Sequence, residues 1–296
     1  MNLTSPSQVK AWCIGNGFHP SRAMGQNFLI DRNVLDAIIE ASGVQAGERV
    51  LEIGPGLGVL TEALLQKGAL VTAVEKDARL AQHLATFFTQ SHRGTETHRE
   101  DKNLKSQISN LKSSVNLCAS VPLCETEIFC ILHADALELS LDDLFTPPFD
   151  RCVSNLPYSI GTRILLDIAR HPKAPPSITV LVQTEVAERL AAKEGGGASR
   201  GQAGVWLQLD YDVKLVRGVR ASCFWPRPEV GSTLIRLDRH PTPSPLNAEE
   251  RKCFETLTRH AFMHRRKQMG AIIAAKSQNG RAVSPKPPLA SPNSRD

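Results

Sequence analysis

The sequence lacks the features of a membrane-spanning or secreted chain. None of its apolar runs approaches the roughly 18 residues that are needed to cross a bilayer. The first residues, "MNLTSPSQVKAWC", show no basic stretch followed by an apolar one, which argues against a secretory signal. We therefore expect a cytoplasmic protein without a membrane partner.

Cysteine chemistry is also missing. The seven cysteines are scattered, and none belongs to a Cys-x-x-Cys pair. Cys118, Cys124 and Cys130 fall six residues apart, which matches no metal-ligand spacing. A chain of 296 residues can bury a sizeable core without disulfides or metals. We expect reduced thiols, no metal site, and one large domain or one large and one small domain.

Charge is present but unevenly distributed. Residues 1–150 hold 12 Lys and Arg against 18 Asp and Glu, whereas residues 151–296 hold 23 against 12. A sharply basic half suggests a polyanionic partner, and nucleic acid is the commonest one. The alternative is that the extra basic residues only keep the surface solvated.

The stretch "ERVLEIGPGLGVLTEALLQKGALVTAVEKD" predicts a β-α-β unit. A short apolar strand over 49–53 ends in a glycine-rich turn, and residues 59–67 then space their apolar side chains at helical intervals. Gly68 stands where a glycine ends a helix, and a second apolar run follows at 70–74. Such a unit implies a parallel sheet and an α/β fold.

The remaining segments extend this sheet and mark its boundaries. We expect strands within 128–137, 152–158, 177–183, 205–219 and 232–239, with helices at 78–88, 163–170 and 185–192. The last two strands fit an antiparallel edge on a parallel sheet. The polar segment at about 91–127 is predicted to be an inserted surface loop.

Four regions follow from these patterns. Residues 1–21 form an N-terminal extension, and residues 22–239 form the main domain. Residues 240–276 begin with a proline-rich linker and continue as a basic helical segment. Residues 277–296 have the composition of a disordered tail.

The glycine-rich turn is a candidate ligand site. Gly54, Gly56 and Gly58 follow a strand and precede a helix, where glycine allows a tight turn and a close approach of backbone to ligand. Glu75 ends the next strand, where its carboxylate can accept from both ribose hydroxyls of an adenosine cofactor. A purely structural turn is the alternative.

The acidic residue before the turn indicates which kind of ligand the site fits. Sites for NAD and FAD prefer G-x-G-x-x-G, whereas this chain has E-x-G-x-G-x-G with Glu52 at its head. A carboxylate there suits a cationic ligand and disfavours a diphosphate, which points to S-adenosylmethionine. Asp135 in "HADAL" could accept from the adenine amine, or it could be a helix N-cap.

The run "SNLPYSIG" carries the candidate chemistry. It follows the fourth predicted strand and therefore lies on the same sheet edge as the glycine-rich turn. The side-chain oxygen of Asn155 and the carbonyl of Leu156 could each accept one N–H of a planar amine such as adenine N6. Pro157 fixes the backbone, and Tyr158 offers a face for an extruded base. A well-formed turn without chemistry is the alternative.

These motifs together carry a family resemblance. "GQNFLID", "LEIGPGLG", "HADAL", "SNLPYSIGT", "FWPRPEVGSTLIRL" and "AFMHRRKQM" occur in this order between Arg22 and Ala275. The chain thereby resembles the small-subunit (16S) ribosomal RNA adenine-N6,N6-dimethyltransferases. The resemblance implies a Rossmann-like S-adenosylmethionine-dependent methyltransferase sheet with a small, shortened C-terminal helical domain.

The resemblance also implies a reaction and its residues. Such enzymes transfer four methyl groups to two adjacent adenosines near the 3′ end of small-subunit rRNA, in an assembling (pre-30S) particle, and we expect a monomer. It places cofactor contacts at Asn27, Leu29, Gly54, Glu75, Asp135 and Asn155, with Gln26 adjacent. It assigns Asn155, Leu156 and Tyr158 to the target adenine, Phe224 to the same stack, and Arg265, Arg266 and Lys267 to rRNA phosphate. For the basic cluster, a solvated helix face is the alternative.

Departures from the family pattern leave other functions open. Thr184 stands where relatives usually carry lysine, the insert at 91–127 is unusual, and a Pro/Ser tail replaces the last helices after Ala275. One alternative function is methylation of a single adenine in large-subunit rRNA, as in antibiotic-resistance enzymes. Another is a weakly catalytic rRNA-binding assembly factor, which the intact "NLPY" and Glu75 argue against.

Overall fold

The computed structural model describes residues 1–22, 24–91, 116–118, 128–193, 200–242 and 244–264. It divides the chain into two compact units, Met1–Pro243 and Ser244–Asp296. Most of the predicted insert, the tail at 277–296 and the basic residues 265–267 lie outside the described residues. In the described part of the chain, no helix is both long and apolar enough to cross a bilayer.

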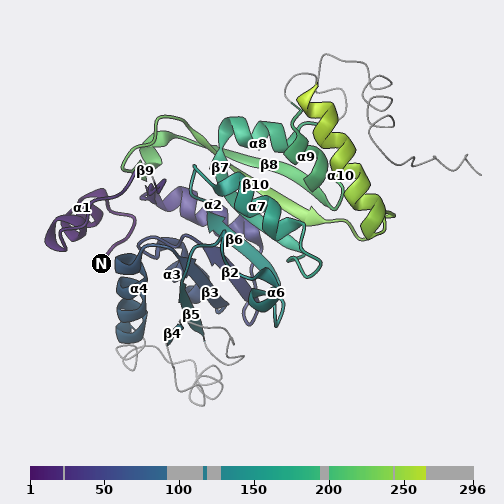
Figure 1. Ribbon diagram of the computed structural model, residues 1–296. Coiled ribbons are helices and arrows are strands. Elements are labelled where there is room, and N and C mark those ends of the chain that lie inside the picture. Colours follow the sequence, from purple (N-terminus) through teal and green to yellow (C-terminus); the bar gives the residue numbers. More distant parts are fainter. Residues whose placement is uncertain (23, 92–115, 119–127, 194–199, 243, 265–296) are drawn as a thin grey trace, which may run out of the picture. The chain divides into compact units, whose positions relative to one another are not determined.

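The first unit is built on an eight-stranded sheet, counted over the described residues (Figure 1). Its strands follow the order β4-β5-β3-β2-β6-β7-β10-β8. Their bounds are β2 Arg49–Ile53, β3 Leu70–Glu75, β4 Asn116–Cys118, β5 Phe129–His133, β6 Arg151–Asn155, β7 Ser177–Gln183, β8 Tyr211–Val219 and β10 Ser232–Arg239. The pairs from β4 to β7 are parallel, and β10 pairs antiparallel with both β7 and β8. The predicted α/β class with an antiparallel edge is confirmed.

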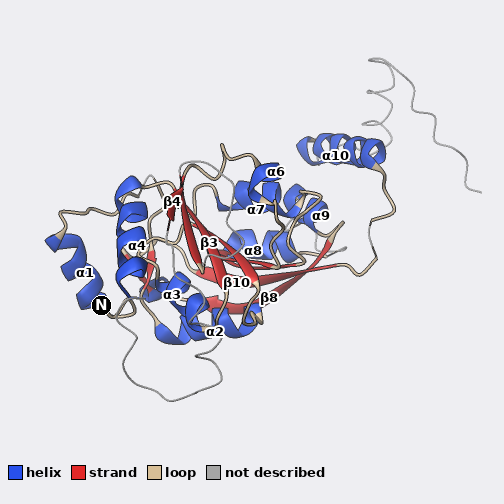
Figure 2. Ribbon diagram, turned by 90° about the horizontal axis from the view of Figure 1, so that it is seen from below, coloured by secondary structure: helices blue, strands red, loops and turns tan. Residues whose placement is uncertain are grey.

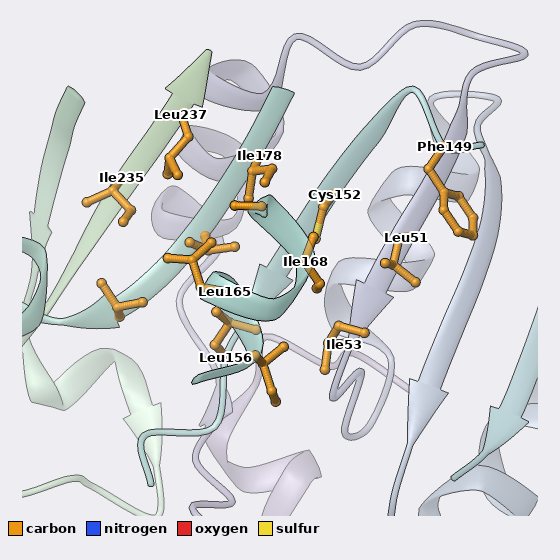
Figure 3. Close-up of a cluster of buried hydrophobic side chains, with 14 of the residues drawn as sticks. Leu51, Ile53, Phe149, Cys152, Leu156, Leu165, Ile168, Ile178, Ile235 and Leu237 are labelled. Atoms are coloured by element: carbon orange, nitrogen blue, oxygen red, sulfur yellow. The ribbon is translucent and has the colours of Figure 1, made fainter. Parts of the chain in front are cut away.

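Helices cover both faces of this sheet (Figure 2). One face packs against α2, α3 and α4, and the other against α6, α7, α8 and α9. The bounds are α2 Arg32–Ser42, α3 Val59–Gln66, α4 Ala78–Ser91, α6 Leu141–Leu144, α7 Gly161–Ala169, α8 Thr184–Ala191 and α9 Gln202–Leu207. Figure 3 shows the second face, where Leu51, Cys152 and Ile178 from neighbouring strands meet Leu165 and Ile168 of α7.

The predicted β-α-β unit is observed almost residue for residue. The strand β2 and the helix α3 lie where the apolar pattern places them, and β3 extends the predicted strand by one residue to Glu75. Gly68 has φ +82° and donates its N–H to the Leu65 carbonyl, so it ends α3 in the left-handed conformation that glycine tolerates. This unit fixes the glycine-rich turn at the carboxyl end of β2.

The N-terminal region contributes a helix and one strand of a second, two-stranded sheet, and its side chains form a third hydrophobic cluster. The helix α1 (Pro6–Gly15) precedes a two-stranded sheet in which β1 (Phe28–Leu29) pairs antiparallel with β9 (Phe224–Trp225). A short 3-10 helix, η2 (Ala221–Cys223), leads into β9. The predicted N-terminal extension at 1–21 is therefore folded around α1 in the described structure.

Two sequence-based expectations differ from the structure. Residues 205–207 were expected to begin a strand but belong to α9. A Cβ on Gly204 would lie 2.5 Å from the Arg189 carbonyl oxygen, so α9 packs closely on α8 at a glycine. The strand β4 also falls inside the segment that was expected to be a loop.

The second unit contributes one described helix, α10 (Ala248–Met263). Its N-terminus is a capping box, in which Asn247 accepts from Glu250 N–H and the Glu250 side chain accepts from Asn247 N–H. The helical prediction for this segment is thus confirmed up to Met263.

Candidate active site

A cavity of about 180 Å³ opens at the carboxyl ends of β2, β3, β5 and β6, the sheet edge on which both motifs were expected. Most of the predicted site residues line it. They are Gln26, Asn27, Leu29, Glu52, Gly54, Gly56, Glu75, Asp135, Asn155, Leu156, Pro157 and Tyr158. The glycine-rich turn and the "NLPY" turn therefore share one cavity.

Two positions of the glycine-rich turn adopt a backbone conformation that favours glycine. Gly54 has φ +68°, and a Cβ there would lie 3.4 Å from Pro157 Cγ. Gly56 has φ +60°, and a Cβ there would lie 3.0 Å from the Phe28 ring. Both residues need the left-handed conformation and the close approach that glycine permits. The first contact joins the two turns directly.

The Glu75 carboxylate is fixed at the end of β3. One oxygen accepts from Gly56 N–H at 3.2 Å and the other from Asp77 N–H at 2.9 Å. The side chain is only 6% exposed, and this burial raises its pKa to about 7. Each oxygen keeps a lone pair for a further hydrogen bond, so the group can accept ligand hydroxyls.

Glu52 lies deeper, on β2 beneath the turn. It is 1% exposed and accepts a hydrogen bond from the Thr61 hydroxyl at 2.7 Å. Burial raises its pKa to about 8, with a smaller contribution from the charge of Glu75. At neutral pH the Glu52 carboxyl is therefore mostly protonated in this state of the protein.

Asn155 ends β6 and is one of the residues that line the cavity. Its Nδ2 donates to the Asn27 carbonyl at 3.1 Å. Its Oδ1 is buried and has no hydrogen-bond partner among the described residues. Native proteins seldom leave a buried acceptor unpaired, and such an atom needs an explanation. A ligand that donates an N–H to this oxygen supplies one.

The carbonyl that closes the turn after Asn155 is that of Pro157, not that of Leu156. Ile160 N–H and Gly161 N–H both donate to the Pro157 carbonyl, at 3.3 and 2.7 Å. The Leu156 side chain is 2% exposed and anchors the turn in the core seen in Figure 3. This anchoring holds the backbone of the turn at the cavity.

Tyr158 offers its ring from the same turn. Its hydroxyl shares a hydrogen bond with Ser232 Oγ, and burial raises its pKa. The ring meets Phe224 edge to face, with centroids 6.4 Å apart. Phe224 itself is 2% exposed and lies outside the cavity lining, so it packs behind Tyr158.

The remaining predicted cofactor residues are held by polar contacts. Asp135 accepts from Lys76 Nζ at 2.7 Å and from Leu137 N–H at 2.9 Å, and the nearby lysine lowers its pKa. The Gln26 side chain accepts from Ser21 N–H and donates to Asp77, which ties the N-terminal segment to the start of α4. Both side chains therefore already have partners.

Gly58 is a structural glycine in this arrangement. It has φ +89°, and a Cβ there would lie 2.6 Å from Leu84 Cδ2. It does not line the cavity and instead permits close packing of α3 against α4.

Several cavity residues were not singled out from the sequence. Gly25 has φ +67°, and a Cβ there would lie 3.0 Å from Tyr158 N, so this segment packs directly on the "NLPY" turn. Phe28 and Lys76 also line the cavity, as does Leu3. Gly25 and Phe28 belong to the "GQNFLID" motif, which could have indicated them, whereas the sequence around Leu3 gives no signal.

A family model described as ribosomal RNA adenine dimethylase matches residues 17–287. The match begins after α1, so residues 1–16 lie outside it.

Curated relatives are similar over most of the chain. A protein named ribosomal RNA small subunit methyltransferase A from Opitutus terrae is 36% identical over 276 residues, which are 92% of this chain and 85% of the relative. One of the same name from Deinococcus radiodurans is 35% identical over 284 residues, 95% of this chain and 81% of the relative.

Solved structures share the fold. A dimethyladenosine transferase from Plasmodium falciparum matches with a TM-score of 0.63 and 24% identity, over 83% of this chain and 74% of that one. The 23S rRNA methyltransferase ErmE matches with a TM-score of 0.56 and 24% identity, over 84% of each chain.

Proposed function

The chain belongs to the ribosomal RNA adenine dimethylase family, and we infer that it methylates N6 of two adjacent adenosines near the 3′ end of small-subunit rRNA. It is an S-adenosylmethionine-dependent enzyme of ribosome biogenesis. Three curated relatives, at 35–38% identity, carry the small-subunit name, which favours this substrate over large-subunit rRNA. The assignment of the site depends above all on the buried, unpartnered side-chain oxygen of Asn155, a residue that lines the cavity.

The cavity residues fit S-adenosylmethionine. Glu75 presents a carboxylate that can accept ribose hydroxyls, and Gly54 and Gly56 leave the cavity wall free of side chains. Asp135 retains lone pairs for an adenine amine beside its contact with Lys76. When bound, the cofactor supplies a methyl group on a sulfonium that is already activated for transfer.

We propose that Asn155 and Leu156 hold the amine of the target base. Its two N–H groups would donate to Asn155 Oδ1 and to the Leu156 carbonyl, which the hydrogen bonds that close the turn leave free. This pairing holds the nitrogen in place and draws it toward tetrahedral geometry, so that its lone pair becomes available. Contact with Gly54 places Pro157, and hence this pair, beside the cofactor turn.

We propose that Tyr158 stacks on the extruded base. A flat ring in the turn suits a base taken out of its helix, and Phe224 supports that ring from behind. The tyrosine hydroxyl is engaged with Ser232 and its pKa is raised, so it is not placed to act as a base. The methylated amine can lose its proton to solvent after transfer.

We further propose that the target is rRNA within an assembling small subunit. We also propose that the enzyme acts as a monomer in the cytoplasm. Arg265, Arg266 and Lys267 would contact rRNA phosphate.

The test is methyl transfer to defined particles. Purified protein is incubated with S-adenosylmethionine and with small or large subunits that lack adenine dimethylation, and rRNA fragments are mapped by mass spectrometry. We expect N6,N6-dimethyladenosine at two adjacent positions near the 3′ end of small-subunit rRNA. Methylation confined to large-subunit rRNA, or cofactor binding without transfer to either particle, would contradict the proposal.

A further inference from the structure

The first residues of the chain form part of the cavity wall. Leu3 is 3% exposed and lines the same cavity as Glu75 and Asn155. Residues 1–16 lie outside the matched family region, so this contact is not supplied by the family motifs. A methyltransferase site built only from those motifs would lack this wall.

A hydrophobic cluster joins the N-terminal segment to the cavity. We call it the N-terminal cluster, and its buried members are Leu3, Val9, Cys13, Phe18, Phe28, Leu57 and Leu80. Phe28, Leu57 and Leu80 also line the cavity. These three side chains therefore lie between the N-terminal segment and the ligand space.

One line of contacts reaches the glycine-rich turn. The rings of Phe18 and Phe28 lie 6.2 Å apart, and Phe28 in turn lies so close to Gly56 that a Cβ there would be 3.0 Å from it. Gly56 N–H donates to Glu75. The position of Phe18 thus bears on the turn that orients the ribose-binding carboxylate.

The segment is held in place by the first turns of α4. The Arg79 guanidinium donates to the carbonyls of Asn16 and Gly17 and lies 5.3 Å from the Phe18 ring. Trp12 of α1 packs on His83 of α4, with ring centroids 4.5 Å apart. These contacts fix the N-terminal segment against the element that follows Glu75.

We propose that Leu3 and Phe18 are positioning residues of the cofactor site. Leu3 completes the apolar wall, and Phe18 holds Phe28 against the glycine-rich turn. The inference rests on the proposed function, because it assigns S-adenosylmethionine to the cavity. Binding linkage is reciprocal, so a segment that strengthens cofactor binding must itself be stabilised by the cofactor to the same degree.

The test compares single substitutions in the full chain. Leu3→Ala and Phe18→Ala are measured beside Ile14→Ala. Ile14 lies on α1, between these two residues in the sequence, but its side chain is 81% exposed. Calorimetry gives the Kd for S-adenosylmethionine, and steady-state assays give the KM for cofactor and for rRNA. We expect the cofactor Kd and KM to rise about tenfold for Leu3→Ala and Phe18→Ala. A tenfold change corresponds to the free energy that the burial of one or two methylene groups contributes. The kcat and the rRNA KM should stay near wild type, and Ile14→Ala should match wild type throughout.

A second measurement uses the wild-type protein and therefore tests the inference even if the variants do not fold. Hydrogen exchange of the wild-type amides in residues 6–18 should slow when S-adenosylmethionine is added. Unchanged exchange there, or unchanged cofactor Kd in folded Leu3→Ala and Phe18→Ala, would overturn this inference alone. Wild-type protein that bound no S-adenosylmethionine would overturn the proposed function as well.

Discussion

The Asn155 side chain donates from Nδ2 to the main-chain carbonyl of Asn27 at 3.1 Å, across 128 residues of chain. A carbonyl can only accept, so this bond fixes which end of the amide carries the nitrogen. The oxygen of this cavity-lining residue is buried and has no partner among the described residues. The "GQNFLID" segment thereby orients the group that is proposed to hold the target amine.

Tyr158 should act through its ring and not through its hydroxyl. Tyr158→Ala removes the stacking face, and we expect kcat/KM for rRNA to fall roughly 10- to 100-fold, since stacking of a base on an aromatic ring contributes about 1–3 kcal/mol. Tyr158→Phe keeps the ring and should retain most activity, with about 1–3 kcal/mol lost in stability because buried Ser232 loses a partner. Steady-state kinetics and thermal unfolding separate the two effects. Equal losses of activity in both variants would argue against stacking.

Cofactor affinity should depend on the ionisation of Glu75. Burial raises its pKa to about 7. The charged carboxylate accepts hydrogen bonds from ribose hydroxyls more strongly than the protonated acid does. The affinity for S-adenosylmethionine should therefore rise as pH increases through about 7 and level off above it. Titration calorimetry between pH 5.5 and 9 measures this.

A matched pair of variants isolates the carboxylate. Glu75→Gln should bind weakly at every pH and lose this component of the pH dependence. Glu62→Gln removes a partly buried carboxyl of α3 that does not line the cavity, so it should follow the wild-type curve. A wild-type pH dependence that persisted in Glu75→Gln would contradict the assignment.

The pH dependence of the free energy of unfolding should reveal the raised pKa of Glu52. Its pKa is about 8 in the folded protein against an ordinary value of 4.5, so the native state retains a proton that the unfolded chain has lost between these values. The free energy of unfolding should therefore decrease through this group as pH rises from about 4.5 to 8, and not further above 8. Glu52→Gln keeps an acceptor for Thr61 and lacks the titration. Its Tm should fall less steeply over this range, and parallel Tm curves for both proteins would refute the burial argument.

The basic residues after α10 should contribute to rRNA affinity through phosphate contacts. Replacing Arg265, Arg266 and Lys267 by alanine should weaken binding and reduce the slope of log Kd against log salt concentration by about 2–3. Lys67→Ala is the control, because this exposed lysine lies before β3 at the sheet edge opposite the cavity. A slope unchanged from wild type in the triple variant would favour the solvated-surface alternative.

Much of the fold and of the site could be predicted because the relevant signals are local. The strands 49–53, 177–183 and 232–239 are short apolar runs bounded by turn residues, and the structure gives them those bounds. The two turns come together because parallel strands present their carboxyl ends on one edge. Glycine at 54 and 56 is explained by the left-handed φ of both residues, and at 56 also by the Phe28 ring, which a Cβ would crowd.

The unpredicted features depend on contacts between distant residues. The short apolar run at 205–207 fits a strand or a helix equally well. It forms part of α9, which packs closely against α8. Phe224 of the "FWPRPEV" motif lies near Tyr158, but its ring is buried where β9 pairs with β1 through Leu29 and Phe224. This pairing joins two motifs that are far apart in the sequence, so neither motif predicts it by itself. The place of Leu3 in the cavity depends on how α1 packs, which no local pattern records.

Asn155 is the residue on which the proposed chemistry most depends, so the most direct test measures Asn155→Ala for cofactor binding and methyl transfer in parallel. We expect the Kd for S-adenosylmethionine to change less than about fivefold, while single-turnover methyl transfer to unmethylated small subunits falls about 100-fold or more, because the amine is no longer held. Circular dichroism confirms that the variant is folded. Transfer at the wild-type rate in folded Asn155→Ala would contradict the central claim.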